Sequence, residues 1–376
     1  MTVEKDDTPP TPDVKTPNKS LENALKAVVA PQGRICITIP DSTRNMDRKT
    51  AIEALSTWLP TNTNAVILIG LGLHRKSSQQ ELSELQSISP WPVRDHDPDT
   101  CVSIGSDGDI PIDLPAEVLE ADALVCAGTI ELHQYAGYSG GYKAFVVGCG
   151  SRRSISALHH RDFICHKDIQ VGQLHNNPFR EHIDRIGQLL PPTTALQFVE
   201  EQGWYVGDPI RTIRGAANQL DSFYPVEKTV EKVVLHLPES KSTNFYQASR
   251  AATYLALSPH PPLKPGAQII IQAACPDGIG SGFGEKNCAV ALRSCAPPWT
   301  ALLSGEFPFQ GGAQRAVMLA RLAQRFELVV AGCDHPEALR ALGITAYSQN
   351  ADEMVPKGTM TVHNPFRKLP QLASFR

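Results

Sequence analysis

The chain has 376 residues, of which 41% are hydrophobic and 20% charged, and its formal net charge is −4. A chain of this length exceeds what one hydrophobic core usually organises, so two domains are expected. The mildly acidic balance gives no electrostatic reason to expect binding to nucleic acid or to an anionic membrane, and no apolar run approaches the ~20 residues of a membrane-spanning helix.

The cysteines and the N-terminal residues indicate the cellular compartment in which the protein is expected to work. Nine cysteines are present, an odd number without a CxxC pair, and several lie in apolar runs typical of strands. This usage indicates reduced thiols and predicts a cytoplasmic protein. Residues 1–20 are polar and rich in proline, so they are expected to be a disordered tail rather than a signal peptide.

Apolar runs alternate with amphipathic segments from residue 21 onward. This alternation predicts helices near residues 21–29, 48–59 and 78–85, and strands at residues 35–39, 65–71 and 123–127. Residues 88–114 are rich in Asp, Pro and Ser, so they are expected to form loop and sheet edge with a short strand near residues 102–104. Strands that alternate with helices are typical of a mostly parallel α/β sheet.

Polar side chains follow three of the predicted strands, at the point where each strand ends. The first strand leads into Pro-Asp-Ser-Thr-Arg, which contains Asp41 and Arg44. The second leads into Gly-Leu-His-Arg, which ends in His74 and Arg75, and the third leads toward His133. Because ligands of open α/β sheets bind beyond the carboxyl ends of the strands, these residues are predicted to share one site.

The segment 131–143 combines glycines with a lysine. Its glycine-rich core is Gly137, Tyr138, Ser139, Gly140 and Gly141. Glycine permits positive φ and a close approach of the backbone to a ligand. Lys143 follows at the expected start of a helix, where the macrodipole disfavours its charged form, so a nucleophilic, covalent lysine is one interpretation. A solvated lysine just past a tight turn is the other.

Three further histidines are candidates. His159 and His160 are adjacent and point to different faces of a helix, which is as compatible with ordinary surface or core positions as with metal binding. His175 precedes a predicted helix at residues 178–189, and its asparagine-rich segment is more typical of a helix cap than of a site.

A domain boundary is expected near residues 221–227, where Tyr224-Pro225 interrupts a helical pattern. The predicted domains are an N-terminal α/β domain at residues 21–225, which includes a strand pair at residues 196–199 and 204–206, and a C-terminal α/β domain at residues 226–376. The second domain is predicted to contain strands at residues 232–237, 268–274, 327–331 and 360–363, and helices at residues 243–257, 313–324 and 336–342.

Two segments of the second domain are candidates for ligand contact. The helix at residues 243–257 carries Tyr246, Gln247 and Arg250, and the last two share a face. Residues 277–284 are glycine-rich and miss the third glycine of a dinucleotide fingerprint. They are interpreted as a flexible loop that closes over an active-site cleft between the domains.

Several of these segments together resemble the lactate racemase family. The resemblance is carried by DSTR at residues 41–44, GLHR at 72–75, ELHQYAGYSGGYK at 131–143, a histidine sixteen residues past the lysine, and FYQA at 245–248. Their order and spacing extend from about residue 35 to residue 321. The resemblance implies an isomerase, a racemase or epimerase of a small 2-hydroxy acid.

The resemblance also implies a nickel-pincer nucleotide, supplied by separate cofactor-biosynthesis proteins, and inversion by proton-coupled hydride transfer to and from it. Lys143 matches the family's covalent attachment site, His159 its protein ligand to nickel, and His74 and His133 its acid/base histidines. A planar four-coordinate site suits Ni(II), and imidazole titrates near neutral pH. The other residues implied in cofactor binding are Asp41, Thr43, Arg44, Tyr138, Ser139, Gly140 and Gly141. The residues expected to contact the substrate are Arg75, Tyr246, Gln247 and Arg250.

Two positions depart from the family's pattern. Arg250 stands where a lysine is usual, and Gly311 stands where a tryptophan is expected. An arginine fork suits a carboxylate, and the loss of an indole opens space, so the substrate is expected to be a larger 2-hydroxy acid, one with a second carboxylate, or a sugar acid. The alternative is that neighbouring side chains refill both positions.

Two other functions are compatible with parts of the pattern. A catalytically silent homologue that binds or carries the cofactor would need only Lys143 and His159, and the presence of both acid/base histidines speaks against it. A zinc hydrolase that uses His74, His133 and His159 lacks HExxH or a comparable ligand spacing. The oligomeric state is not predicted.

Overall fold

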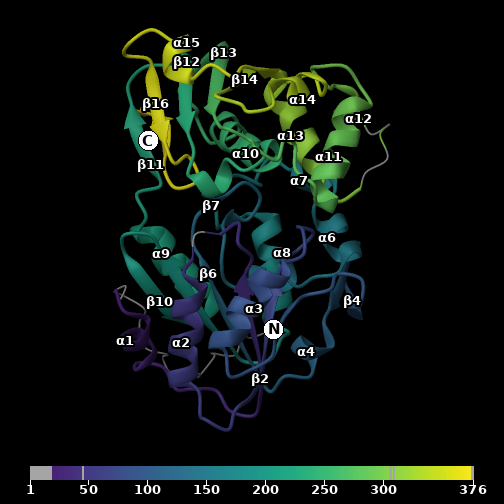
Figure 1. The fold of residues 1–376 in the computed structure, drawn as a ribbon, viewed down its shortest axis with the longest axis vertical. Helices are drawn as coiled ribbons and strands as arrows, with labels where there is room; N and C mark the ends of the chain where they lie inside the picture. Colours follow the sequence, from purple (N-terminus) through teal and green to yellow (C-terminus); the bar gives the residue numbers. More distant parts are fainter. Residues whose placement is uncertain (1–18, 45, 305–306, 308–309, 374–376) are drawn as a thin grey trace, which may run out of the picture.

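The computed structural model describes residues 19–44, 46–304, 307 and 310–373. They form a mixed α/β fold in which two mostly parallel sheets are each flanked by helices, as the alternating pattern predicts. The two sheets and their helices occupy opposite halves of the molecule (Figure 1). The predicted disordered tail lies outside the described residues except for its last two, and Ser20 caps the first helix. No described helix is long and apolar enough to cross a membrane.

The first sheet has six strands in the order β10-β9-β6-β1-β2-β3. They are β1 (Arg34–Pro40), β2 (Asn64–Gly70), β3 (Val93–Asp95), β6 (Ala123–Thr129), β9 (Thr193–Val199) and β10 (Gly203–Gly207). Every neighbouring pair is parallel except β9 and β10. The carboxyl ends of β1, β2 and β6 therefore meet at one edge, where the chain enters its polar segments.

The helices of this half are α1 (Leu21–Leu25), α2 (Arg48–Trp58), α3 (Gln79–Ile88), α4 (Ala116–Leu119), α5 (Lys143–Val146), α6 (Arg152–Leu158), α7 (Arg161–Ile164), α8 (Pro178–Gly187) and α9 (Pro209–Gln219). Side-chain caps define where several of them begin. Ser78 and Glu81 form a capping box at α3, and Asn177 caps α8 ahead of a proline at its first turn.

The second sheet has five parallel strands in the order β15-β14-β13-β12-β16. They are β12 (Val230–His236), β13 (Leu263–Gln272), β14 (Glu327–Ala331), β15 (Thr345–Ala346) and β16 (Met360–His363). The helices of this half are η1 (Glu239–Lys241), α10 (Phe245–Ala256), α11 (Phe283–Arg293), α12 (Ala301–Ser304), α13 (Ala313–Ala323), α14 (Pro336–Arg340) and α15 (Ala351–Met354).

Three elements differ from the expectation. Residues 88–114 contain an antiparallel hairpin of β4 (Val102–Asp107) and β5 (Ile110–Leu114), longer than one short strand. Helix α11 begins at Phe283, inside the segment interpreted as a flexible loop. The C-terminal segment forms β17 (Leu369–Leu372), which pairs in parallel with β11 (Phe223–Val226) and returns the chain to the expected boundary region.

The largest hydrophobic core runs through both halves. It includes Phe145 and Phe179 from the first half and Phe245, Leu319 and Phe366 from the second. A short ribbon of β7 (Leu132–His133) and β8 (Gly137–Tyr138) lies at the junction, and Leu132 N–H donates to the carbonyl of Phe366. The glycine-rich segment is thereby held between the two halves.

Candidate active site

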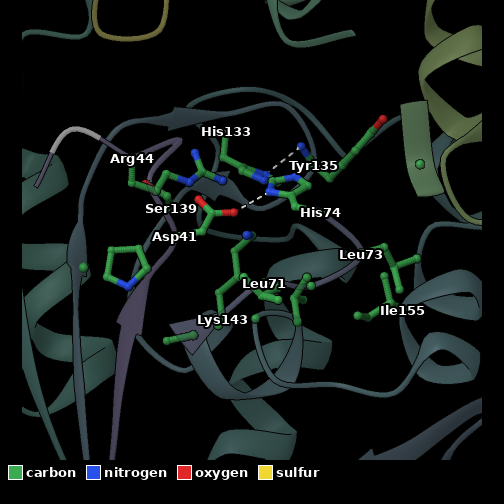
Figure 2. Close-up of a pocket in the computed structure, with 18 of the residues that line it drawn as sticks. Asp41, Arg44, Leu71, Leu73, His74, His133, Tyr135, Ser139, Lys143 and Ile155 are labelled. Carbon is green, nitrogen blue, oxygen red and sulfur yellow. Dashed lines mark hydrogen bonds and ion pairs between the residues drawn. The ribbon is translucent and has the colours of Figure 1, made fainter. Parts of the chain in front are cut away.

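A cavity of about 170 Å³ lies at the carboxyl ends of β1, β2 and β6, and it is closed on the other side by residues of α10, α11 and α13. Most of the residues predicted to share a site line it (Figure 2). They are Asp41, Arg44, His74, His133, Ser139, Gly140, Lys143, His159, Tyr246, Gln247 and Arg250.

Asp41 and His74 form a hydrogen-bonded pair. Asp41 Oδ2 lies 2.6 Å from His74 Nδ1, and Thr43 donates to Asp41 Oδ1 from its backbone N–H at 3.0 Å and its hydroxyl at 2.6 Å. Burial alone would raise the pKa of Asp41, but the charge and hydrogen bond of His74 and the hydroxyl of Thr43 lower it below its ordinary value. The carboxylate therefore stays ionised, orients the ring, and leaves His74 Nε2 as an acceptor.

His133 is held in the opposite sense. Its Nδ1 accepts from the backbone N–H groups of Tyr135 at 3.3 Å and Ala136 at 3.1 Å, so in the neutral ring the proton resides on Nε2. Burial lowers the pKa of His133 well below its ordinary value, and the charges of Lys143 and Arg250 lower it further. His133 is therefore a neutral imidazole whose Nε2–H is a donor.

Lys143 starts α5 and extends from the turn at Gly140 into the cavity, with its amine directed toward Asp41 and His74 (Figure 2). Within the described part of the chain its amine has no hydrogen-bond or ion-pair partner. Burial lowers the pKa of Lys143 well below its ordinary value, and Arg44 and Arg250 add to that effect. A neutral amine is favoured, which is the form that acts as a nucleophile.

His159 lies on the same cavity wall, at the end of α6. Its Nδ1 donates to the carbonyl of Ile155 at 2.8 Å, so Nε2 carries the free lone pair of the ring. Burial lowers the pKa of His159 to about 4. The imidazole is thus neutral and oriented, the state that a metal ligand requires.

The substrate-side residues occupy one turn of α10. Asn244 caps the helix, and Arg250 donates to Gln247 Oε1 at 3.0 Å and to the Tyr254 hydroxyl at 2.7 Å. Tyr246 also lines the cavity, and its hydroxyl lies 3.4 Å from Gln314 Nε2.

Four predicted site residues do not line this cavity. Arg75 is an exposed residue that pairs with Glu81 at 3.0 Å, so the expectation that it contacts substrate does not agree with its position. Thr43 contacts the cavity only through Asp41. The Gly141 N–H donates to Gln197 Oε1 at 3.1 Å, and the Tyr138 carbonyl accepts from Arg180, so both support the turn rather than a ligand.

Gly311 does not open the cavity. A Cβ built there would lie 2.6 Å from Leu73 Cδ1 and 2.9 Å from Ser156 Oγ, so neighbouring side chains already occupy that space. Gly311 lines a separate hollow beside Arg152 and Phe283. At this position the second alternative holds, in which neighbours refill the place of the expected indole.

Sequence reasoning missed several charged and polar residues near the cavity. Lys241 is 1% exposed, donates to the Thr43 carbonyl at 2.7 Å and lies 3.6 Å from Glu131 Oε2. Glu131 in turn lies 3.7 Å from Arg44 Nη1. Burial would raise the pKa of Glu131, but Lys241 and Arg44 lower it. Glu131 lies in the segment 131–143 that the sequence analysis singled out. Lys241 lies in none of the motifs, and no sequence pattern indicated that it would be near the site.

The donor set fits a covalently held nucleotide with a bound metal. Three residues that line the cavity have a buried polar atom without a hydrogen-bond partner, at Thr38 Oγ1, Thr129 Oγ1 and Arg44 Nη1, and these atoms would serve a polar ligand. Among the described residues no three His, Cys, Asp or Glu side chains are grouped to hold a metal ion, which disfavours a zinc site made of histidines. A metal bound by His159 would need its other ligands from a cofactor.

Comparison with protein families supports the resemblance in the first half. Residues 13–172 match the family model described as the lactate racemase N-terminal domain. The lactate racemase of Thermoanaerobacterium thermosaccharolyticum is 34% identical over 134 residues, which cover 33% of this chain and 30% of that protein. The lactate racemase of Lactiplantibacillus plantarum is 31% identical over 246 residues, 59% of this chain and 55% of that protein. The matched segments thus span about half or less of these relatives.

Comparison with solved structures extends the likeness to nearly the whole fold. The lactate racemase apoprotein of Thermoanaerobacterium thermosaccharolyticum superimposes with a TM-score of 0.76 at 20% identity, covering 96% of each chain. A protein from Thermotoga maritima superimposes with a TM-score of 0.73 at 16% identity, covering 95% of this chain and 99% of that one. At these identities the likeness establishes the fold alone.

Proposed function

Because the chain is a homologue of the lactate racemase family, we propose that it is a racemase or epimerase of a 2-hydroxy acid that uses a nickel-pincer nucleotide bound to Lys143. The observation that carries the proposal is the convergence, in one cavity, of an Asp41–His74 pair, a neutral His133, a lysine without a partner and an oriented His159. When bound, the cofactor supplies reversible hydride acceptance. All other steps belong to side chains of this chain.

Lys143 and His159 would hold the cofactor and its nickel. The neutral amine of Lys143 suits covalent attachment, and the lone pair on His159 Nε2 suits one coordination position of Ni(II). Arg44, Ser139 and Gly140 lie beside them on the cavity wall. The cofactor would come from separate biosynthetic proteins, which are the partners this proposal requires.

His74 and His133 would move the hydroxyl proton. In the described arrangement both rings are neutral, and His74 Nε2 is free to accept a proton, so turnover would need one further proton on the pair, with the imidazolium as the acid and the neutral ring as the base. One enantiomer would lose its hydroxyl proton to His74, and the mirror-related enantiomer would lose it to His133 after the exchange of roles. Gln247 and Arg250 on α10 would orient the carboxylate of a substrate other than lactate.

The experiment is co-production of the chain with cofactor-biosynthesis proteins, followed by intact mass, nickel content and a chirality assay on a panel of 2-hydroxy acids. Wild type is expected to carry an adduct at Lys143, to bind nickel and to racemise or epimerise at least one acid. The Lys143→Ala variant should fold without either the adduct or activity. An adduct with nickel but no turnover would replace the proposal with a silent cofactor carrier, and absence of both would overturn it.

A further inference from the structure

A second polar group, apart from the residues of the proposed centre, lines the cavity. Gln134, Tyr135 and Arg315 are 5%, 4% and 4% exposed, and all three line the cavity. Gln134 and Tyr135 follow His133 in the glycine-rich segment, whereas Arg315 lies in the first turn of α13. The group therefore joins the two halves of the molecule across the cavity.

The charge of Arg315 has only neutral partners. Its Nη1 donates to Gln134 Oε1 at 3.0 Å and to Thr253 Oγ1 at 3.0 Å. Among the described residues no carboxylate lies within ion-pair distance of this guanidinium. Because a buried charge is normally compensated by an opposite one, Arg315 lacks the partner that its burial calls for.

Three donors of this group also have no hydrogen-bond partner: Arg315 Nε, Gln134 Nε2 and the Tyr135 hydroxyl. The amide of Gln134 is oriented unambiguously, since Arg315 can only donate and must therefore face the amide oxygen. Gln134 Nε2 is consequently a free N–H donor. The unused groups are thus two obligate donors, a hydroxyl and a positive charge, a set that favours an acceptor-rich anion.

The group borders the proposed centre through the Tyr135 ring, whose hydroxyl points away from Asp41, His74 and Lys143 (Figure 2). The Tyr135 ring is 5.4 Å from the His159 ring and 5.9 Å from the His133 ring, measured between centroids. Arg250, the residue expected to meet the first carboxylate, is a separate cation on α10 with its own partners Gln247 and Tyr254. Besides Arg250, Arg44 and Lys143, the cavity therefore offers a further cationic position at Arg315, and two unused neutral donors, Gln134 Nε2 and the Tyr135 hydroxyl, belong to the residues beside it.

We propose that Gln134, Tyr135 and Arg315 bind a second, distal carboxylate, so that the substrate is a 2-hydroxy dicarboxylic acid. This inference rests on the proposed function for its reaction, but the binding site itself does not depend on that reaction. A planar carboxylate would meet the guanidinium edge at Nε and accept from the amide and the phenol. A polyol would leave the guanidinium charge uncompensated, which is why the dicarboxylic acid is preferred over a sugar acid.

The test measures the affinity of the full chain, produced without cofactor, for three four-carbon acids by calorimetry. Malate carries the second carboxylate, 2-hydroxybutyrate has a methyl group in its place, and threonate carries hydroxyl groups. Malate is expected to bind at least about tenfold more tightly than either of the others, because it gains a charge-assisted contact. Equal affinities, or a preference for threonate, would overturn the proposal.

Variants connect the preference to these side chains. Arg315→Gln should abolish the malate preference, and Tyr135→Phe, which removes one hydroxyl and preserves the packing, should reduce it about threefold. The matched control is Arg325→Gln, an exposed arginine ten residues further along the chain, and it should leave all affinities unchanged. Persistence of the preference in both Arg315→Gln and Tyr135→Phe would overturn the assignment even if one variant folded poorly.

Assays on protein co-produced with the cofactor-biosynthesis proteins distinguish this proposal from the proposed racemase function. If the chain gains the Lys143 adduct and racemises 2-hydroxybutyrate as well as malate, the racemase function stands and the dicarboxylate inference fails. If malate is preferred but no adduct or nickel is found, the carboxylate subsite stands and the racemase function fails. If Arg315→Gln instead lacks the adduct, the group serves the cofactor and the inference is overturned.

Discussion

His74 and His133 differ in what holds them, and the difference assigns their resting roles. A carboxylate accepts from Nδ1 of His74, whereas two backbone N–H groups donate to Nδ1 of His133. A carboxylate partner stabilises an imidazolium, and backbone donors disfavour one. His74 Nε2 is thus the ring nitrogen that is free to accept the hydroxyl proton, whereas His133 Nε2 carries a proton.

Asp41→Asn tests this assignment. The amide cannot stabilise a protonated His74, so turnover is expected to fall about 10²-fold or more. The Lys143 adduct and nickel content, measured by intact mass and metal analysis, should stay at wild-type levels, because Asp41 orients the base rather than holding the metal. Unchanged turnover would show that His74 does not act as a base, and loss of the adduct would place Asp41 in cofactor binding.

Lys143 illustrates the conflict between stability and function. A buried amine without a partner costs folding free energy, because it must either stay charged in an apolar site or give up its proton on folding. Lys143→Met removes the amine and keeps the apolar stem, so in protein made without cofactor the free energy of unfolding is expected to rise by about 0.5–2 kcal/mol. Urea unfolding would measure it. Lys286→Met, at an exposed lysine of α11, is the control, and its free energy of unfolding should not rise.

At the scale of elements, the turn between β8 and α5 is what delivers Lys143. Gly140 has φ +96°, and a Cβ there would clash with Gln197 Oε1, the same oxygen that accepts from Gly141. A side chain at Gly140 would therefore strain the backbone and displace the residue that fixes the turn.

Gly140→Ala is expected to lower the free energy of unfolding by about 2–5 kcal/mol, from left-handed strain and overpacking together. Gly358→Ala separates the two causes, since Gly358 has φ +90° but open space around its Cβ position. It should lose only about 1–2 kcal/mol. If chemical denaturation showed equal losses of unfolding free energy in Gly140→Ala and Gly358→Ala, steric overlap at Gly140 would contribute nothing.

The elements also show what the sequence can and cannot predict. Apolar runs and polar strand ends predict β1, β2 and β6 and bring Asp41, His74 and His133 together, because parallel strands share one edge. Helix α11 follows directly on glycine-rich residues that indicate a loop, so its start was not expected. Strand β17 is a four-residue strand containing a proline, and it is defined by its pairing with β11, which no local pattern reveals.

Side chains that meet across long separations were the least predictable. Gln134 and Arg315 are 181 residues apart, and Lys241 and Thr43 are 198 apart. Neither pair has a spacing signal, because the contact depends on how the two halves are joined. Arg75 is the converse case: it follows a strand end like His74, yet Glu81 holds it at the surface. The domain division at residues 225 and 226 stays a prediction.

At the scale of the whole molecule, polar contacts join the halves around the cavity. Lys241 from the second half donates to the carbonyl of Thr43, the residue that holds Asp41, and pairs with Glu131. On the other side Arg315 donates to Gln134. A change at either contact alters both the junction and the site, so closure of the halves and organisation of the site are linked.

Lys241 makes this linkage depend on pH. Burial lowers the pKa of Lys241 from 10.5 to about 8, with Glu131 opposing the shift. Below about pH 8 the ammonium pairs with Glu131, and above it the pair is lost. The kcat/KM of the loaded enzyme is therefore expected to fall as pH rises through about 8, and Lys241→Arg, which stays charged, should keep its activity to higher pH.

The free energy of unfolding should change with pH in the opposite direction to kcat/KM. The unfolded chain keeps the Lys241 proton up to about pH 10.5 while the folded chain loses it near 8, so unfolding takes up a proton between these values. The free energy of unfolding contributed by this group therefore rises with pH across that window. Denaturation at pH 7.5 and 9.5 should show wild type gaining relative to Lys241→Met. A parallel fall of stability and activity would mean that alkaline inactivation is unfolding rather than loss of the Lys241 contact.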